Sequence, residues 1–450
     1  MSEDESNLWI AQRHGQDWRD EHVLDAVNWL YEAIPAAEIR GRVEAADSFF
    51  QAAKQKWAQG DRVPLYDGKD KIAWYVHQAL RYADPAFRSE FFLPEGYRIA
   101  PLFRRLGQLL PHLRTVKAVD DRATRLLLKD RAQPDDGIYE LLVAGAYKCR
   151  GWDSVEFLEE TPGKGKRNDL MVECRSKQWA IECKRTGRSG YAHEERLAAE
   201  KIASRAHSLS KRADRSFVVL AQYKDEIVDL GERYLEGKIE RFLQSSGPFE
   251  WDSESSRGVV FEMPWTDLHA VMTHDDIYFG SSRMVELVLG EYDPIMDFSM
   301  DGTWTPAERR PLHATWVDQA SLVVWRSTSE VAAQRKARHF RSVVGRASQQ
   351  LPGDMDGAIH VGYETIGGNS VDGIRHHLNQ QIMMDFEAGR TGLRMVYGNY
   401  FMPELVTSRN ESCAVSETLA WYPVGEGPET HPLPEHMLFL DEDGLPGSHL

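Results

Sequence analysis

The stretch "RNDLMVECRSKQWAIECKR", residues 167–185, decides how the middle of this chain folds. Apolar and polar side chains alternate along two runs joined by the short polar loop 175–178, which predicts a β-hairpin with one buried face. Six apolar side chains share that face: Leu170, Val172, Cys174, Trp179, Ile181 and Cys183. The opposite face carries Asp169, Glu182 and Lys184. That polar face is either solvated surface or a metal site.

The hairpin lies in a basic part of an acidic chain. The formal net charge is −16, whereas residues 164–215 alone carry a net charge of +7. A chain with this overall charge is not expected to coat nucleic acid over its whole surface. A confined basic patch indicates an anion-binding surface, and the alternative is a solvated charged face.

Length and composition predict a folded protein of two or three domains. The chain has 450 residues, of which 42% are apolar and 28% are charged,. No apolar run approaches the roughly 20 residues that span a bilayer. The start, "MSEDESNLW", is too acidic and polar for a secretory leader,. We therefore expect a cytoplasmic protein without a membrane partner. The four cysteines lack the spacing of zinc ligands, and we interpret Cys174 and Cys183 as reduced core thiols,.

Three regions differ in their periodicity. Residues 1–125 predict a helical region, because several segments place apolar residues three and four apart between Pro- or Gly-containing breaks. This region carries no catalytic signature and is a candidate for partner binding, substrate positioning or homo-oligomerisation. Residues 126–245 predict the order helix, three strands, helix, strand, helix. Residues 246–450 predict an α+β region that ends in a loosely packed, Pro-, Gly- and acid-rich tail over 424–450,.

The predicted helix over 192–213 leads to the apolar strand 216–222, which a crossover connection makes parallel to a neighbour. The same order of strand, basic helix and strand recurs over 321–364. The last region is therefore a candidate second copy of the middle one, or the recurrence arises by chance. In a second copy, Val324 and Arg326 would stand where Glu182 and Lys184 do.

The pairing of the hairpin fixes which polar side chains meet. If residues 175–178 form the loop, Asp169 lies opposite Lys184, and Met171 lies opposite Glu182. Asp169 and Glu182 are then diagonal neighbours on one face, roughly 7–8 Å apart at the backbone and close enough to share an ion. Glu182 and Lys184 point the same way because they are two apart on one strand.

Two carboxylates and a backbone carbonyl suit Mg²⁺, which prefers oxygen ligands and keeps several waters. Asp169, Glu182 and the carbonyl of Cys183 would supply these ligands. Such an ion polarises a phosphodiester and activates a water beside it. The ammonium of Lys184 would orient that water, stabilise charge developing on phosphorus, or act as a base.

Asp169, followed on the next strand by Glu182-Cys183-Lys184, resembles the PD-(D/E)xK nuclease superfamily. The surrounding order of elements is similar to the restriction-endonuclease-like core of that family, over roughly 110 residues. Asn168 stands where the family often has Pro. The resemblance implies an α/β fold, a Mg²⁺- or Mn²⁺-dependent endonuclease and a setting in restriction or anti-phage defence. It also implies that residues 246–450 are a candidate degenerate nuclease-like unit.

The family often adds a carboxylate from the first helix, and Glu140 is the acid within the predicted helix 137–149. Glu140 is therefore either a metal or water ligand or a surface acid. Glu173, further along the polar face, is interpreted as solvated or as a neighbour of the ligands. The candidate nucleic-acid contacts are basic: Lys164, Lys166, Arg167, Arg185, Arg188, Lys201 and Arg205.

The sequence thus predicts a metal-dependent nuclease, with DNA favoured over RNA as the substrate. Two alternatives stay open. The first is a nucleic-acid-binding or scaffold protein on an inactive nuclease fold, against which the intact Asp169, Glu182 and Lys184 argue. The second is an RNA-cleaving enzyme of the same fold.

Overall fold

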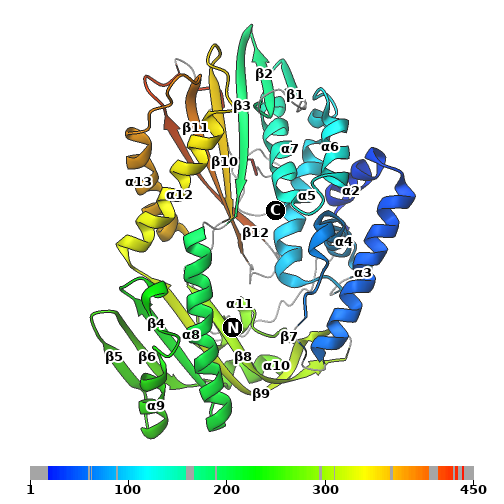
Figure 1. The fold of residues 1–450 in the computed structure, drawn as a ribbon. Helices are drawn as coiled ribbons and strands as arrows, with labels where there is room; N and C mark the ends of the chain where they lie inside the picture. Colours follow the sequence, from blue (N-terminus) through cyan, green and yellow to red (C-terminus); the bar gives the residue numbers. More distant parts are fainter. Residues whose placement is uncertain are drawn as a thin grey trace, which may run out of the picture.

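The computed structural model describes residues 19–58, 61, 63–87, 90–158, 167–187, 190–292, 296–308, 310–364, 368–404, 414–428, 431–433 and 438–439. Over these residues the chain has a mixed α/β fold with two mixed β-sheets. The expected α/β class is confirmed. In Figure 1 one sheet occupies the upper half of the molecule and the other the lower half.

The amino-terminal third is helical, as its periodicity predicts. The α-helices are α2 (Glu21–Ala33), α3 (Ala36–Ala58), α4 (Lys71–Ala83), α5 (Leu93–Leu113), α6 (Val119–Leu128) and α7 (Pro134–Cys149). Short 3₁₀ helices lie at η1 (Gly68–Asp70) and η2 (Pro85–Phe87). Helix α2 starts where the side chain of Asp20 accepts a hydrogen bond from the Val23 amide at 3.1 Å, because that amide has no partner within the helix,.

These helices do not form a core of their own. One hydrophobic cluster runs from Val23 on α2 through Leu142 on α7 to Ile181 on the first sheet and ends at Phe439. The boundary that the sequence places near residue 125 therefore falls inside a shared core. The amino-terminal region packs onto the first sheet and helps to hold it in place.

The first sheet has the strand order β1-β2-β3-β10-β11-β12. Its strands are β1 (Ser154–Phe157), β2 (Leu170–Cys174), β3 (Lys177–Thr186), β10 (Gly357–Glu364), β11 (Leu393–Glu404) and β12 (Ala414–Pro423). Strands β1, β2 and β3 pair antiparallel, while β3, β10 and β11 are parallel neighbours. Helix α7 contacts β3 within the first core, and α12 (Glu330–Ser348) packs on the other face beside α13 (Gly368–Met384).

The second sheet has the order β5-β6-β4-β9-β7, with β8 paired to β9. Its strands are β4 (Phe217–Tyr223), β5 (Phe249–Asp252), β6 (Ser256–Glu262), β7 (Ile277–Tyr278), β8 (Asp297–Ala307) and β9 (Arg310–Ser327). Helices α8 (Gly190–Ala213) and α9 (Glu236–Gln244), with η3 (Ile227–Asp229), cover one face. Helices α10 (Thr266–Met272) and α11 (Ser282–Leu289) lie on the other.

The chain crosses from the first sheet to the second and back again. Strand β3 leads through α8 to β4, but β4 pairs in parallel with β9 of the second sheet. Strand β9 in turn leads through α12 to β10, which returns to pair in parallel with β3. The predicted parallel strand 216–222 is present. It does not complete the hairpin's own sheet, however, so residues 126–245 do not form one core by themselves.

The recurrence of strand, basic helix and strand is visible in this exchange, but the proposed residue equivalence is not. Ala180 packs in the cluster that includes α12, and Glu182 and Lys184 share its face of β3 because the side-chain period is two,. Val324 instead packs with α10 and α11, on the face of β9 away from α8. Val324 and Arg326 therefore do not occupy the positions of Glu182 and Lys184.

Part of the predicted loose tail is packed into the first core. Leu433, Leu438 and Phe439 are each at most 1% exposed within the first core. The amides of Leu438 and Phe439 donate hydrogen bonds to the carboxylate of Glu417 on β12, at 2.9–3.1 Å. Within the described parts of the chain, no helix is both long and apolar enough to cross a bilayer.

Candidate functional site

The hairpin of residues 167–185 forms, with a register that differs from the expected one. Glu173 pairs with Gln178 and Val172 with Trp179, so that only Arg175 and Ser176 make the turn. Both turn residues have positive φ, 49° and 67°, as a type I′ hairpin turn requires,. The pairing is shifted by two residues from the one based on a four-residue loop. A shift of two keeps every side chain on its expected face, whereas a shift of one would have inverted the faces.

The corrected register brings the two acids closer than expected. Leu170 pairs with Ile181, and continuing this register places Asp169 directly opposite Glu182 instead of diagonal to it. Asp169 lies in the bend just before β2, and its Oδ2 accepts a hydrogen bond from the Cys183 amide at 2.7 Å. The preceding Asn168 is buried and donates from its side chain to the Leu170 carbonyl at 2.6 Å, which fixes the start of the strand.

Glu182 is fully buried, at 0% exposure, and shares its site with Lys184. The Lys184 ammonium forms an ion pair with Oε1 of Glu182. Among the described residues, neither carboxylate oxygen of Glu182 accepts a well-formed hydrogen bond. Burial, and then the charge of Asp169, raise the pKa of Glu182 to about 8, although the Lys184 charge opposes them,.

The same surroundings also shift the pKa values of Asp169 and Lys184. The pKa of Asp169 is raised, mainly by loss of water around it, against the favourable charge of Lys184. The pKa of Lys184 is also raised: desolvation lowers it, but the nearby Glu182 and Asp169 outweigh that loss. Two opposed carboxylates whose pKa values are both raised mark a place where a cation is favoured,.

Glu140 of α7 lies beside this acidic pair and is not a surface acid. Its carboxylate forms an ion pair with Arg122 Nε of α6 at 2.6 Å, and its side chain is 13% exposed. Burial and the charge of Asp169 raise the pKa of Glu140 well above its usual range, although Arg122 lowers it. Glu140 therefore joins the acidic pair electrostatically while Arg122 holds its carboxylate.

Sequence reasoning did not identify two further acids, Asp135 and Asp136, in the first turn of α7. Burial, and then the charge of Asp135, raise the pKa of Asp136, while Lys184 is among the charges that lower it. Asp135 accepts hydrogen bonds from the Tyr75 hydroxyl at 2.8 Å and from Arg98 at 3.0 Å. The sequence does carry a signal for these acids. Pro-Asp-Asp stands at the start of an apolar helix, and acids are favoured at the amino end of a helix.

The predicted basic contacts are distributed over both halves of the molecule. Arg167 is exposed next to Asn168, and Arg185 stacks over the Phe401 ring at 5.2 Å. Lys201 and Arg205 lie on α8 against the second sheet, and both face Glu232, at 3.8 Å and 3.5 Å. Three further candidates lie outside the described residues: Lys164, Lys166 and Arg188.

The cysteines fit their expected role in part. Cys183 is buried, and burial raises the pKa of its thiol well above the usual range. Cys174, at the turn end of β2, is only half-buried.

Glu173 accepts a hydrogen bond from the Gln178 side chain at 3.0 Å on the exposed end of the hairpin, away from the acidic pair.

The fit of this site to a metal ion is partial. Across the described residues, no group of three or more His, Cys, Asp or Glu side chains stands ready to hold an ion. The acids instead contact protein cations and donors: Glu140 contacts Arg122, Glu182 contacts Lys184, and Asp169 contacts the Cys183 amide. The opposed carboxylates of Asp169 and Glu182 are the part of the site that suits a divalent cation.

Comparison with known proteins identifies no matching family model, no matching curated protein and no matching solved structure.

Proposed function

We propose that this protein is a metal-dependent nuclease that hydrolyses phosphodiester bonds in nucleic acid, with DNA favoured over RNA. The observation that carries the proposal is the opposed pair of the partly buried Asp169 and the fully buried Glu182, with Lys184 beside it. Two opposed acids whose pKa values are both raised cost the fold stability, so their presence is better explained by a cation that they bind,.

Asp169, Glu182 and the Cys183 carbonyl would hold a Mg²⁺ or Mn²⁺ ion. When bound, the ion supplies charge stabilisation for a phosphodiester and lowers the pKa of a bound water. Glu140 would join as a ligand, directly or through water, only by leaving Arg122. The residues of the chain itself bind the phosphate, orient the water and exclude competing solvent.

Lys184 is the residue that can serve the phosphate. Its side chain is 32% exposed, whereas that of Glu182 is fully buried, so the ammonium lies closer to solvent than the Glu182 carboxylate does. A cation at that place can contact a phosphate oxygen and the attacking water together. Arg167, exposed at the start of the hairpin, can contact a neighbouring phosphate,.

The arrangement of strands around the pair also supports this function. An antiparallel β1–β2–β3 meander preceded by α7 and continued by a parallel strand agrees with the expected restriction-endonuclease-like core, with β10 in the place expected for β4. In the sequence, the segment from α8 to β9 then stands between β3 and α12 as an inserted unit with its own sheet. A role in restriction or anti-phage defence stays a proposal that the resemblance implies.

The test is incubation of purified protein with supercoiled plasmid, linear duplex, single-stranded DNA and RNA, each with Mg²⁺, Mn²⁺ or EDTA. We expect cleavage of DNA with a divalent metal and none in EDTA. Cleavage of RNA alone would support the same chemistry on a different substrate. Binding without cleavage under every metal condition would favour the inactive-fold alternative.

A further inference from the structure

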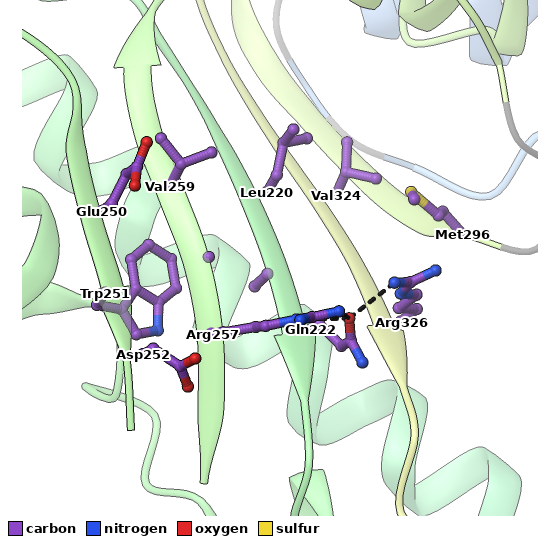
Figure 2. Close-up of a pocket in the computed structure, with 12 residues that line it drawn as sticks. Leu220, Gln222, Glu250, Trp251, Asp252, Arg257, Val259, Met296, Val324 and Arg326 are labelled. Atoms are coloured by element: carbon purple, nitrogen blue, oxygen red, sulfur yellow. Dashed lines mark hydrogen bonds between the residues drawn. The ribbon is translucent and has the colours of Figure 1, made fainter. Parts of the chain in front are cut away.

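A second polar site lies on the second sheet, away from the acidic pair. It is a pocket of about 550 Å³ on the sheet face that α10 and α11 leave partly open. The pocket sits over β5, β6, β4 and β9, toward the carboxyl ends of the parallel strands β4 and β9 (Figure 2). Nothing in the proposed nuclease chemistry uses these residues.

The pocket is built from two rows of side chains that run across the sheet. One row is polar, because Arg257, Gln222 and Arg326 are direct neighbours on β6, β4 and β9. The adjacent row is apolar over the same strands, with Val259, Leu220 and Val324. Figure 2 shows the two rows side by side, with Met296 closing the end next to Arg326.

The polar row places two like charges on one neutral acceptor. Arg257 donates from Nε and Nη2 to Oε1 of Gln222 at 3.0 Å and 2.8 Å, and Arg326 donates from Nη2 to the same oxygen at 2.7 Å. Adjacent strands are about 4.8 Å apart, so the two arginine backbones are only about 10 Å apart. A single amide oxygen satisfies donors from both guanidinium groups but neutralises neither charge.

The acid next to Arg257 in the polar row is paired with a lysine. Asp252, next to Arg257 in the same row, forms an ion pair with Lys224, which also donates to the Ser253 carbonyl at 2.8 Å. Glu250 lies one row further on, opposite Val259 at the edge strand, and is exposed. The charged side chains that line the pocket are therefore two arginines and two acids, and one of the acids is engaged by Lys224.

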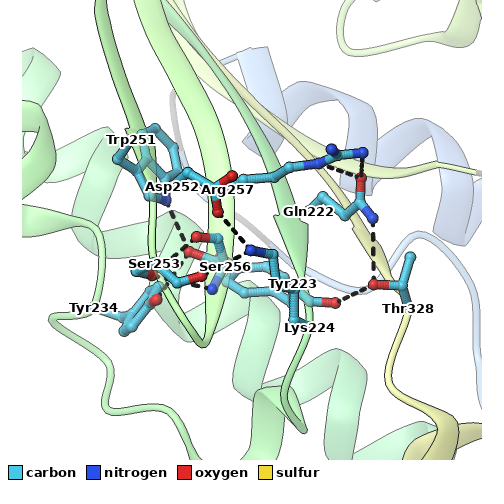
Figure 3. Close-up of polar contacts among 10 residues, drawn as sticks. All are labelled: Gln222, Tyr223, Lys224, Tyr234, Trp251, Asp252, Ser253, Ser256, Arg257 and Thr328. Atoms are coloured by element: carbon cyan, nitrogen blue, oxygen red, sulfur yellow. Dashed lines mark hydrogen bonds and ion pairs between the residues drawn. The ribbon is translucent and has the colours of Figure 1, made fainter.

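The strand ends that carry the polar row are held by further hydrogen bonds (Figure 3). The Gln222 side-chain amide donates to the Thr328 hydroxyl at 3.3 Å, and the Thr328 amide donates to the Tyr223 carbonyl at 2.8 Å. On the neighbouring strands, the Trp251 indole donates to the Ser256 hydroxyl at 2.8 Å. The two arginines are therefore presented by a fixed framework, which suits recognition of a rigid oxyanion.

We propose that this pocket binds a nucleotide unit of single-stranded nucleic acid, with its phosphate between Arg257 and Arg326 and its base on the apolar row. The phosphate oxygens take the place of the Gln222 carbonyl as the acceptor for both arginines. A planar guanidinium group can donate two parallel hydrogen bonds to a phosphate, which favours phosphate over a monatomic anion. The apolar row lies two residues along the strands from the polar row and gives the base an apolar surface to pack against. This inference rests on the proposed function only for the identity of the ligand, as it assigns a nucleic-acid contact far in sequence from Asp169.

The test measures binding in EDTA, where cleavage is not expected, so its outcome is separate from that of the nuclease assay. The probes are a labelled short single-stranded DNA, the corresponding 5′-mononucleotide and inorganic phosphate. For the DNA, we expect Arg257→Gln and Arg326→Gln each to weaken binding at least fivefold. The matched control is Arg233→Gln, because the side chain of Arg233 is 77% exposed outside the pocket. This control should bind as wild type does.

A pair of substitutions at Gln222 distinguishes a binding role from a structural one. Gln222→Ala frees both guanidinium groups and should strengthen binding of all three probes. Gln222→Glu places an internal carboxylate between them and should abolish binding of the mononucleotide and of phosphate. If both substitutions change binding in the same direction, or if none of the four pocket variants differs from Arg233→Gln, the site is wrong. If phosphate binds as tightly as the mononucleotide, the assignment of the base to the apolar row is wrong.

Discussion

Asp169 and Glu182 face each other across the β2–β3 hairpin, and the charge of Asp169 adds to burial in raising the pKa of Glu182, while Lys184 limits the effect. The relationship depends on the two-residue turn at Arg175 and Ser176, because a longer loop would offset the two acids. In the proposed function, the opposed acids would hold a divalent cation at the end of a strand, beside Lys184, whose side chain is 32% exposed.

The first prediction concerns the cost of this pair without metal. Removing the Asp169 charge should stabilise the folded protein, because Glu182 can then ionise beside Lys184 at a pKa closer to its usual value. In EDTA at neutral pH, Asp169→Asn should raise the free energy of unfolding by about 1–2 kcal/mol, the equivalent of roughly one pKa unit. The Asn carbonyl can still accept the Cys183 amide. Urea unfolding measures the change.

The matched control is Glu173→Gln, on the same face of the hairpin but near the turn, which should change stability by less than about 0.5 kcal/mol. A destabilisation by Asp169→Asn equal to that of an ordinary core substitution would show that the pair holds the fold together rather than straining it.

A second prediction concerns the ion pair between Arg122 and Glu140. Arg122 is buried and also donates to Asp130 at 3.1 Å; its removal leaves Glu140 without its ion pair, while Asp130 keeps its ion pair with Arg125. Arg122→Met should cost about 3–5 kcal/mol. Adding Glu140→Leu to that variant should recover most of the loss, since no unpaired acid then remains on α7. Additive losses in the double variant would mean that the two side chains are not coupled.

The thiols give a third prediction. Cys183 should resist alkylation in the folded protein, while the half-buried Cys174 should react faster,. Cys183→Ser should cost about 1–3 kcal/mol, because it places a hydroxyl in the core. Mass spectrometry of each labelled peptide separates the two sites. Labelling of Cys183 as fast as Cys174 would contradict the observed register of β3.

A fourth prediction concerns pH and the carboxylate of Glu417, away from the acidic pair. Burial raises the pKa of Glu417 to about 7, although it accepts hydrogen bonds from Leu438, Phe439 and Asn399 and faces the charge of Arg150. Because this pKa is raised in the folded state, the folded protein binds the proton more tightly than the unfolded chain does. Stability should therefore fall as pH rises from about 4.5 to about 7 and then level off.

The measurement is the free energy of unfolding of wild type and Glu417→Gln across this pH range. Arg105 and Tyr139 also lie close enough to sense the charge of Glu417, and neither is expected to titrate within the range. The substitution should reduce the slope between pH 4.5 and 7, whereas Glu182, with its pKa raised to about 8, contributes the same slope to both proteins. An identical slope in the two proteins would assign the pH dependence to other groups.

The sequence predicts the elements of this fold well and their partners less well. Alternation along residues 167–185 identifies the hairpin and its faces, because burial on one side imposes a period of two. It does not identify the turn, since Arg175 and Ser176 take positive φ without the Asn-Gly or Asp-Gly signal that usually marks such turns,.

The exchange of β4 and β10 between the sheets could not be predicted. An apolar strand after a crossover helix has the same pattern in either sheet, because both places bury it on two faces. Alternation identifies the acids of the candidate site where it places them on the polar face of the hairpin, as for Asp169 and Glu182. It does not identify Asp135 and Asp136, because only tertiary packing brings the start of α7 toward Lys184.

The most direct test of the central claim compares DNA cleavage with Mg²⁺ or Mn²⁺ by wild type, Asp169→Asn, Glu182→Gln and Lys184→Ala, with Glu173→Gln as control. The account predicts that wild type and the control cut, while each of the other three loses several orders of magnitude in rate and still binds DNA. It also predicts that Lys184→Ala retains metal binding, measured by calorimetry. Cleavage at the wild-type rate by all three variants, or binding without cleavage by wild type with every metal, would contradict it.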